Sequence, residues 1–579
     1  MAEVINELIE FVRENELSVF NRTKTTIRQG SGSIFKTVDA KTIYNKVISK
    51  ISQNFSFAET NNLFQYFGFT ENIQEIKRRQ EFFRSVFSLG VGNNSFLKEL
   101  RIPRGTWRPK YETLVVTENE ETFIQLQKLS CPVKYITCYE DLQGLETCDV
   151  IQVVDCENLS RALESLPQTV FLNSLDEVYL ERYIEILSGW KDNLLILEKN
   201  ETNSEIKKIV GEIIPLLGFL EKKDMRNISK EYVEQIIGGV NENILEEVKK
   251  MTLTGSSLVE ILSRKLPVEL NEMIEKELKK TNLPLEIFNI SIPITLDERE
   301  LEEFIRRQNS NEFTDSAEAV KRKAKQLIEV PEKLKHLEEL VLVFDFLSGV
   351  YNFVKTIEAK NYPEESGDFI LEKGKNILIE KPQPVSFFLN NESKCSILTG
   401  ANSGGKTTLL EHIVQAISFF NLGLPVFAEN IKLPVFSEVY YFAKNKGSMS
   451  KGAFETLLTQ MSGIKPGKKT LILADEMEAV TEPGVAASIV CATAEYFINK
   501  DCFLVIATHL GQEIQKHLPL RARIDGIEAK GLDENNELIV DHNPVLGRLA
   551  NSTPELIVER LANTQKSDYF NFLNEYIKR

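Results

Sequence analysis

The feature that most constrains this chain is a glycine-rich segment at residues 395–411, CSILTGANSGGKTTLLE. A short apolar run at 396–399, which predicts a buried strand, leads into glycines and then into Lys406 and Thr407 at the start of an apolar helix. This spacing matches a phosphate-binding loop, in which backbone N–H groups surround phosphate oxygens at a helix N-terminus. Lys406 would reach the outer phosphates of ATP, and the Thr407 hydroxyl would hold Mg²⁺. The expected nucleotide contacts are Gly400, Ala401, Asn402, Ser403, Gly404, Gly405, Lys406, Thr407 and Thr408.

Two further segments predict strands that deliver polar groups to the same site. Residues 469–476, KTLILADE, end an apolar run in two carboxylates, and residues 503–507 lead into Thr508 and His509. The carboxyl ends of neighbouring parallel strands form the usual ligand edge of such a sheet. We expect Asp475 to bind Mg²⁺, Glu476 to polarise the attacking water, and His509 to sense the terminal phosphate. The alternatives are that the acids only cap a strand and that the histidine is structural.

Several segments together resemble the MutS family of DNA-binding ATPases. They are GANSGGKTTL at 400–409, GLPVFAENIKLPVFSEVYY at 423–441, DEMEAVTEPG at 475–484 and ATHL at 507–510. The resemblance covers roughly residues 370 to 565 and implies a dimeric ATPase that binds DNA. It further implies that Asn402 contacts phosphate or the partner subunit. Phe387 would stack on adenine, with Phe388 as the alternative.

The chain departs from the family pattern at two places. The family offers a serine to the nucleotide of the opposite subunit, shortly before a phenylalanine, and counting back from Phe454 reaches Gly452. Ser448 and Ser450 are the candidate substitutes. Where the family has a glycine-rich turn after its acids, this chain has Glu478 and Val480. Communication between paired sites is therefore expected to differ.

Composition bounds the rest of the molecule. A chain of 579 residues is long enough for about four domains. It has no apolar run that approaches the ~18 residues of a membrane span, and its N-terminus reads as an acidic amphipathic helix, so a cytoplasmic, nucleoid-associated protein is expected. The seven cysteines show no C-x-x-C pair, which argues against a disulfide framework or a zinc site. A net charge of −16 argues against indiscriminate coating of nucleic acid, although local patches can reverse the field.

Periodicity divides the chain into four segments. We predict a helical core domain at 1–110, a small α/β domain at 111–199, a helical lever and clamp region at 200–362, and a MutS-like ATPase domain with a helical tail at 363–579. The fold class is therefore multidomain α and α/β, with an inserted α/β domain and a C-terminal P-loop domain of the ABC-like type. The α/β domain has strands near Leu114, Val133, Val150, Val170 and Leu195. An apolar stripe from Leu334 to Ile357 predicts a long helix, which reads either as a lever or as an ordinary bundle helix.

Two basic zones are candidates for DNA contact. One is KELRIPRGTWRPK at 98–110, around Trp107, with Arg78 and Arg79 nearby in sequence. The other comprises Arg306, Arg307, Lys321, Arg322 and Lys323. Each reads equally as a solvated face, and the MutS resemblance favours DNA backbone contact for the second zone. Such contacts would be salt-sensitive and indifferent to sequence.

The sequence therefore predicts a homodimeric, ATP-hydrolysing protein that controls a clamp on branched, distorted or mismatched DNA, in repair or recombination. Phe57-Ala58-Glu59 fits the three-residue wedge of the family's mismatch reader, but the N-terminal domain that carries that wedge has no counterpart here. Mismatch recognition of the usual kind is therefore not expected. The alternative hypotheses are an ATP-gated dimeric scaffold for which DNA is incidental, and a structural-maintenance or transporter-type ATPase, which would need a long coiled coil or a membrane partner.

Overall fold

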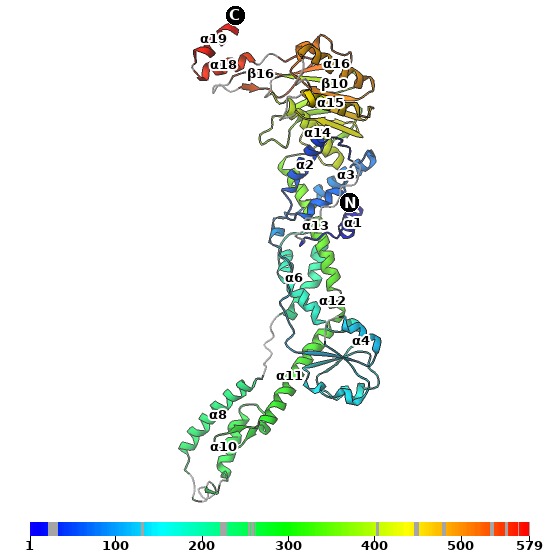
Figure 1. Cartoon of the computed structure of the whole chain (residues 1–579). Coiled ribbons are helices and arrows are strands. Elements are labelled where there is room, and N and C mark those ends of the chain that lie inside the picture. Colours follow the sequence, from blue (N-terminus) through cyan, green and yellow to red (C-terminus); the bar gives the residue numbers. More distant parts are fainter. Residues whose placement is uncertain are drawn as a thin grey trace. The chain divides into compact units, whose positions relative to one another are not determined.

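The chain forms two compact units that interleave along the sequence (Figure 1). Unit 1 comprises Met1–Glu99, Asn200–Ile206 and Glu338–Arg579, and unit 2 comprises Leu100–Lys199 and Lys207–Leu337. The division cuts across the four predicted segments, because helix α13 (Val330–Thr356) contributes residues to both units. The computed structural model describes residues 1–20, 33–128, 132–220, 228–252, 255, 260, 262–263, 265–400, 404–444, 451–477, 482–532, 538–550, 554–565 and 567–577.

The N-terminal part of unit 1 is helical and packs around α13. Its helices are α1 (Ala2–Glu14), α2 (Val38–Ser52), η1 (Glu59–Gln65), α3 (Ile73–Leu89) and η2 (Ser95–Glu99). Phe346 of α13 is fully buried against the rings of Phe55, Phe64 and Phe67. Next to it, buried Asp345 accepts hydrogen bonds from the backbone of 56–57 and from two side chains. These bonds offset the cost of burying the carboxylate and fix the loop before η1 on the helix.

The centre of unit 1 is a six-stranded sheet in the order β12-β13-β14-β10-β15-β18. The first five strands are parallel and β18 is antiparallel to β15. Burial of every residue of β13 and β14 explains their continuous apolar sequences. The strands are β10 (Cys395–Gly400), β12 (Glu438–Phe442), β13 (Thr470–Asp475), β14 (Phe503–Ala507), β15 (Ala522–Ile527) and β18 (Val545–Leu546). The three strands predicted at 396–399, 469–476 and 503–507 are thus confirmed.

A second sheet in unit 1 has the order β7-β11-β8-β9. Its strands are β7 (Glu364–Glu365), β8 (Phe369–Gly374), β9 (Val385–Leu389) and β11 (Asn430–Leu433). Residues 374–388 thus cover the end of β8 and most of β9, and both strands lie outside the main sheet. Strand β8 pairs antiparallel with β9 on one side and with β11 on the other, and β11 pairs parallel with β7.

The helices of unit 1 that follow the sheets are α14 (Lys406–Leu422), α15 (Lys451–Ser462), α16 (Pro483–Asn499), α17 (Gly511–Gln515), α18 (Pro554–Gln565) and α19 (Asp568–Ile577). A short hairpin of β16 (Ala529–Leu532) and β17 (Leu538–Val540) precedes α18. Helix α14 is buried on nearly all sides, between the main sheet and helices α2 and α3. It is apolar around its circumference for that reason. The helical tail predicted from residue 554 onward is formed by α18 and α19.

The N-terminal segment also contacts the sheet directly. Phe35 forms a parallel bridge with Val439 of β12, and the Thr37 hydroxyl donates to the Tyr441 carbonyl at 2.7 Å. Asp39 accepts a hydrogen bond from the Ala443 backbone at 3.0 Å. These contacts join residues about four hundred positions apart and attach the helical region to the sheet within one unit.

Unit 2 contains a four-stranded parallel sheet in the order β2-β1-β3-β4. Its strands are β1 (Thr113–Thr117), β2 (Val133–Tyr135), β3 (Val150–Val153) and β4 (Thr169–Phe171), with α4 (Glu120–Gln127), η3 (Tyr139–Leu142), η4 (Leu145–Thr147), α5 (Ser160–Glu164) and η5 (Leu175–Glu177) between or after them. The four strands predicted near Leu114, Val133, Val150 and Val170 are confirmed. The fifth, near Leu195, is wrong, because this residue lies in helix α6 (Glu181–Lys199).

The remainder of unit 2 is helical with one small hairpin. Its elements are α7 (Ser204–Ile213), whose first three residues belong to unit 1, η6 (Ile214–Leu220), α8 (Lys230–Lys250), α10 (Val268–Lys279), η7 (Leu285–Ile287), β5 (Phe288–Asn289), β6 (Thr295–Leu296), α11 (Glu298–Lys321) and α12 (Ala324–Ile328). One apolar core joins α8, α10, the hairpin and the start of α11. The hairpin follows η7 directly and precedes α11. Within the described residues, no helix has the length and apolarity that crossing a membrane requires.

Candidate nucleotide site and nucleic-acid contacts

The carboxyl ends of β10, β13 and β14 meet at one edge of the main sheet. Asp475 is in register with Ala507, which is in register with Leu398. Backbone hydrogen bonds continue this register beyond the strands, from Glu476 N to the Ala507 carbonyl and from Thr508 N to the Leu398 carbonyl, both at 2.9 Å. The acids, the histidine and the glycine loop predicted from separate segments therefore lie at one ligand edge.

The ends of the loop require glycine for steric reasons. Gly400 has φ +138°, and a Cβ there would lie 2.5 Å from the Ile527 carbonyl oxygen of β15. Gly405 has φ +94°, and a Cβ there would lie 2.8 Å from His542 Nδ1. Both positions combine a left-handed backbone with a close neighbour, which only glycine accommodates. Of the predicted loop contacts, Ala401, Asn402 and Ser403 lie outside the described residues.

Helix α14 starts at the loop and carries the next two candidate residues. Lys406 is 4% exposed, and its Nζ donates to the Gly400 carbonyl at 2.7 Å. The Thr407 hydroxyl donates to Asp475 Oδ2 at 2.5 Å. Thr408 follows on the same turn, where its carbonyl accepts from Asn376 at 3.3 Å.

The carboxylate oxygens of Asp475 are placed as expected for a metal ligand. Asp475 is 4% exposed, and Oδ1 is buried without a hydrogen-bond partner among the described residues. Burial raises the pKa of this carboxyl, and the hydrogen bond from Thr407 only partly opposes the effect. A buried, unsatisfied carboxylate oxygen beside a threonine hydroxyl is a donor pair that Mg²⁺ accepts.

Glu476 is held between two basic side chains. His509 Nε2 lies 2.8 Å from Oε1, and Lys444 Nζ lies 2.5 Å from Oε2. Burial favours the neutral acid, but hydrogen bonds from Lys444 and His509 outweigh it, and the pKa of Glu476 is lowered. The residue has φ +52°, an uncommon backbone conformation for a side chain of this size. Glu476 is therefore ionised at neutral pH and oriented by two partners.

Sequence reasoning missed two residues at this edge. Lys444 follows β12, the parallel neighbour of β13, so strand order was the signal that could have identified it. His542 lies between β17 and β18, and its Nδ1 is 2.9 Å from the Gly404 carbonyl. Because it reaches the loop from more than a hundred residues away, no local motif marks it.

The structure gives opposite environments to the two candidate adenine-stacking residues. Phe387 is fully buried and packs edge-on against Phe369, so its ring has no face left for a ligand. Phe388 is 38% exposed, and the Arg523 guanidinium lies 4.6 Å from its ring centroid. Of the two candidates, Phe388 therefore presents the accessible ring.

Most of the residues predicted to contact the nucleotide of the opposite subunit lie outside the described residues. Ser448 and Ser450 lie outside the described residues, as do Glu478 and Val480. Gly452 lies in the first turn of α15, after Lys451.

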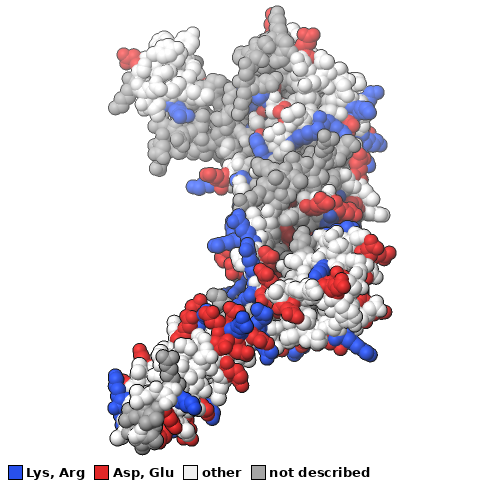
Figure 2. All heavy atoms as spheres, turned by 60° about the horizontal axis from the view of Figure 1, so that its bottom comes forward, with Lys and Arg blue, Asp and Glu red and all other residues white. Residues whose placement is uncertain are grey.

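The five candidate DNA-binding residues of the second basic zone differ in their surroundings. Arg306, Arg307 and Arg322 are exposed, and the last two form i,i+4 pairs with glutamates of α11. Lys321 donates to the Phe171 carbonyl and so ties α11 to the α/β sheet. Lys323 lines a cavity of unit 2. Figure 2 shows basic and acidic side chains intermixed over this unit.

Arg78 and Arg79, considered with the first basic zone, are engaged inside unit 1. Arg79 is 7% exposed and donates to the Asn421 carbonyl of α14 at 2.9 Å. Arg78 donates to Glu7 of α1 at 2.6 Å. Arg79 therefore attaches α3 to α14 and is not accessible to a DNA backbone.

Comparison with known proteins identifies the relatives of this chain. It is 30% identical to the DNA-binding protein MutS2 of Pyrococcus furiosus over 582 aligned positions, which cover 93% of this chain and 99% of the relative. It is 26% identical to the DNA mismatch repair protein MutS of Thermotoga maritima over 36% of this chain and 26% of that protein. It is 31% identical to the endonuclease MutS2 of Aquifex aeolicus over 31% of this chain and 24% of that protein. No protein-family model matches the chain. The chain belongs to the MutS family.

Proposed function

We propose that this protein is a MutS-type DNA-binding ATPase with an ABC-like P-loop domain, which hydrolyses ATP in a dimer to control a clamp on branched or distorted DNA. The observation that carries the ATPase proposal is the meeting of Lys406, Thr407, Asp475, Glu476 and His509 at one edge of a parallel sheet. The names of the relatives, two of which are a DNA-binding protein and a mismatch repair protein, support DNA as the partner.

Each residue of the edge would have a separate task in phosphoryl transfer. Lys406 would move from the Gly400 carbonyl to the outer phosphates, where its charge stabilises the transferring group. Thr407 and Asp475 would hold Mg²⁺, which when bound neutralises charge on the phosphate oxygens. Glu476 would accept a hydrogen bond from the attacking water and align it. His509 and Lys444 would keep this carboxylate ionised and directed.

Adenine recognition is proposed for Phe388 in place of Phe387. Its ring is exposed on one side, and Arg523 packs on it while donating to Asp525 at 2.7 Å. Because Asp525 holds the Arg523 guanidinium in place, the Phe388 ring is already ordered before an adenine base binds. His542, which contacts the Gly404 carbonyl, would border the same nucleotide.

DNA contact is proposed for the helical part of unit 2. Helices α8, α10 and α11 and the β5–β6 hairpin share one core, so they can act as a rigid clamp. Arg306, Arg307 and Arg322 are exposed on or just after α11, and exchange of a glutamate partner for a phosphate costs little for surface pairs of this kind. Helix α13 contributes residues to both units, which supports a lever role.

Nucleotide binding and hydrolysis are separable by two substitutions. Lys406→Ala should weaken ATP binding by about 10- to 100-fold, the value of a charge-assisted hydrogen bond. Glu476→Gln should leave binding intact and lower the hydrolysis rate by ~10² to 10⁴-fold, or about 3 to 5 kcal/mol in barrier height. Binding would be measured with a fluorescent ATP analogue and hydrolysis by phosphate release.

Matched controls exist in the same unit. Glu438→Gln changes a glutamate of β12 at the opposite edge of the main sheet, and Lys432→Ala removes a half-exposed lysine of β11. Both should behave as the unmodified protein. Equal hydrolysis by the Glu476→Gln and Glu438→Gln proteins would contradict the assignment of the catalytic carboxylate.

A further inference from the structure

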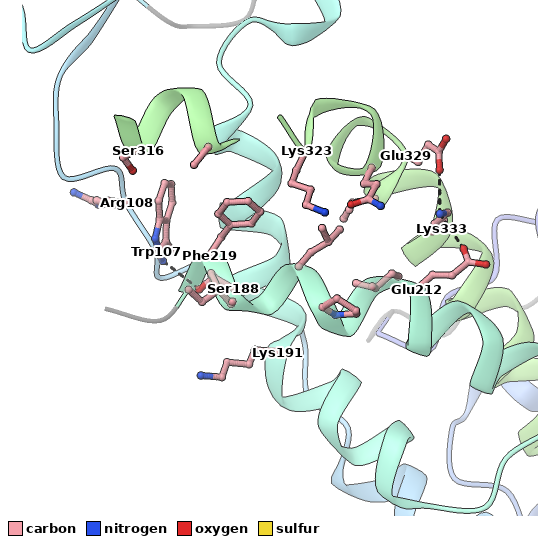
Figure 3. Close-up of a pocket in the computed structure, with 18 of the residues that line it drawn as sticks. Trp107, Arg108, Ser188, Lys191, Glu212, Phe219, Ser316, Lys323, Glu329 and Lys333 are labelled. Carbon is pink, nitrogen blue, oxygen red and sulfur yellow. Dashed lines mark hydrogen bonds and ion pairs between the residues drawn. The ribbon is translucent and has the colours of Figure 1, made fainter. Parts of the chain in front are cut away.

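Unit 2 contains a cavity of about 1610 Å³ that the proposed ATPase cycle does not use. It is lined by residues of the segment 106–111, of α6, of 211–220, of the end of α11 and of 323–333 (Figure 3). This volume is above the ~300 to 1,000 Å³ of typical small-molecule pockets. The site therefore has room for a ligand larger than a metabolite, or for part of a polymer.

Three aromatic residues line the cavity, and one of them, Tyr111, is buried. Trp107 belongs to the irregular segment after η2, and Phe219 belongs to η6. Both are only partly buried, and Figure 3 shows their rings on the same side of the cavity. Partly exposed rings that face a common space offer stacking surfaces for a planar group.

The segment that carries Trp107 is held rigidly on α6. Asn193 accepts from the Arg101 backbone N–H at 3.0 Å and donates to the Arg101 carbonyl at 2.8 Å. Ser188 Oγ accepts from Trp107 N at 3.2 Å. A Cβ at Gly189 would lie 3.0 Å from the Arg104 backbone, so the two segments pack without intervening side chains. An extended segment fixed in this way presents its aromatic residue with little conformational entropy left to lose.

Basic and acidic side chains line the rest of the cavity in nearly equal number. Its lining has six basic residues, which are Arg108, Lys110, Lys191, Lys323, Lys325 and Lys333, and five acidic ones, which are Asp192, Glu212, Glu312, Asp315 and Glu329. Lys333 pairs with Glu212 at 2.9 Å and Glu329 at 3.0 Å. In Figure 3 the Lys323 side chain points toward the cavity.

We propose that this cavity binds an unpaired nucleotide of a DNA strand. The base would stack on Trp107 and Phe219, and the adjoining phosphates would be bound by Lys323 with Lys191 and Arg108. Aromatic platforms beside cations are the general means of binding single strands without sequence preference. The inference rests on the proposed DNA binding and is independent of ATP hydrolysis.

This site gives a physical reason for a preference for distorted DNA. In a matched duplex every base is stacked and paired, so delivery of one to the cavity costs a few kcal/mol. A junction, gap or mismatch already contains a base that is less well stacked, and the same contact costs less there. Selectivity would then come from the ease of extruding a base.

The two tryptophans of the chain allow a direct test. Trp190 is buried in α6, so in a Trp190→Phe protein the fluorescence arises from Trp107 alone. Titration with a 12-nucleotide oligo(dT) should quench this fluorescence as the base stacks. In a protein that keeps Trp190, Trp107→Ala should weaken oligo(dT) binding by about tenfold, measured by anisotropy of a labelled strand, and should leave matched-duplex binding unchanged.

Lys323→Ala tests the phosphate contact. It should reduce the slope of log K against log salt for oligo(dT) by about 0.7, the value of one phosphate contact on a single strand. Lys335→Ala is the matched control, because this lysine is exposed on α13 and does not line the cavity. It should leave the slope unchanged.

The outcomes separate this inference from the proposed function. If duplex and oligo(dT) bind but the Trp107→Ala change affects neither, the cavity is not the strand site and the MutS-type proposal stands. If Trp107→Ala weakens both DNAs equally, the residue contributes to a general surface and the inference is wrong. If no DNA binds, both proposals fail.

Discussion

At the scale of single residues, the pKa values of the neighbouring acids Asp475 and Glu476 are shifted in opposite directions. Burial raises the pKa of Asp475, whereas Lys444 and His509 overcome burial and lower the pKa of Glu476. Environments that separate two adjacent carboxyl groups in this way are typical of sites where the groups have different tasks. The separation fits a metal ligand followed by a carboxylate that orients water.

His412 makes the stability of unit 1 depend on pH. It is buried in α14, and burial lowers its pKa to about 4, whereas the unfolded chain takes up the proton near 6.5. The stabilising contribution is therefore fully present above pH 6.5 and is lost as the pH falls toward 4. From pH 7 to pH 5, the free energy of unfolding should therefore fall by about 2 kcal/mol on account of His412.

Urea unfolding at the two pH values checks this prediction. The fall in unfolding free energy from pH 7 to pH 5 should be about 2 kcal/mol smaller in the His412→Gln protein. His517 is exposed, and the His517→Gln protein should show the full fall. An identical loss in both proteins would exclude His412 as its source.

The limits of sequence reasoning at this scale are geometric. The phosphate-loop motif identified Lys406 and Thr407 because their spacing is local. Phe387 was chosen over Phe388 because, along a strand, a shift of one residue moves a side chain to the opposite face, and only the register of β9 decides which ring is buried. Lys444 and His542 reach the site through strand order and a distant loop, which no local pattern records.

At the scale of elements, an apolar run predicted the wrong structure once. Residues 194–197 read as a strand, but Leu187, Trp190, Leu194 and Leu197 recur at three- and four-residue spacing and form the buried face of α6. Short apolar runs are ambiguous between helix and strand, and the length of the surrounding pattern decides. Similarly, β8 pairs with β11, which lies beyond α14 in sequence, and no local pattern records this pairing.

Helix α19 presents an aromatic face that we propose a second copy of the chain covers. Tyr569, Phe572 and Tyr576 lie at three- and four-residue spacing and are 64%, 64% and 67% exposed. Apolar faces of this kind in soluble proteins mark association surfaces. Phe572→Asp should therefore convert a dimer into a monomer in sedimentation velocity experiments, because a charge would be desolvated in the interface.

The neighbouring Asn571→Asp substitution is the control for this helix. It introduces the same charge at an exposed position outside the aromatic triplet and should leave the dimer intact. The dimer surface would have to lie elsewhere if the Phe572→Asp protein sedimented as a dimer.

At the scale of the whole molecule, each unit is formed by segments that lie far apart in the sequence. Unit 1 combines the first hundred residues with the last two hundred and forty, and contacts such as Thr37 to Tyr441 close this long separation. Periodicity gave the helices and strands, but it carries no information on which distant segments pair. The four-stranded sheet of unit 2 is built from strands that follow one another closely in sequence, and it was correspondingly easier to predict.

We propose that nucleotide hydrolysis by this protein responds to DNA structure. The most direct measurement is steady-state ATP hydrolysis without DNA and with matched duplex, mismatched duplex and four-way junction, using the Glu476→Gln protein to exclude contaminating activity. We expect that the junction stimulates hydrolysis more than matched duplex does, and that the Glu476→Gln protein shows no stimulation. Hydrolysis that is indifferent to all three DNAs would contradict this proposal and would favour an ATP-gated scaffold in which DNA binding is incidental.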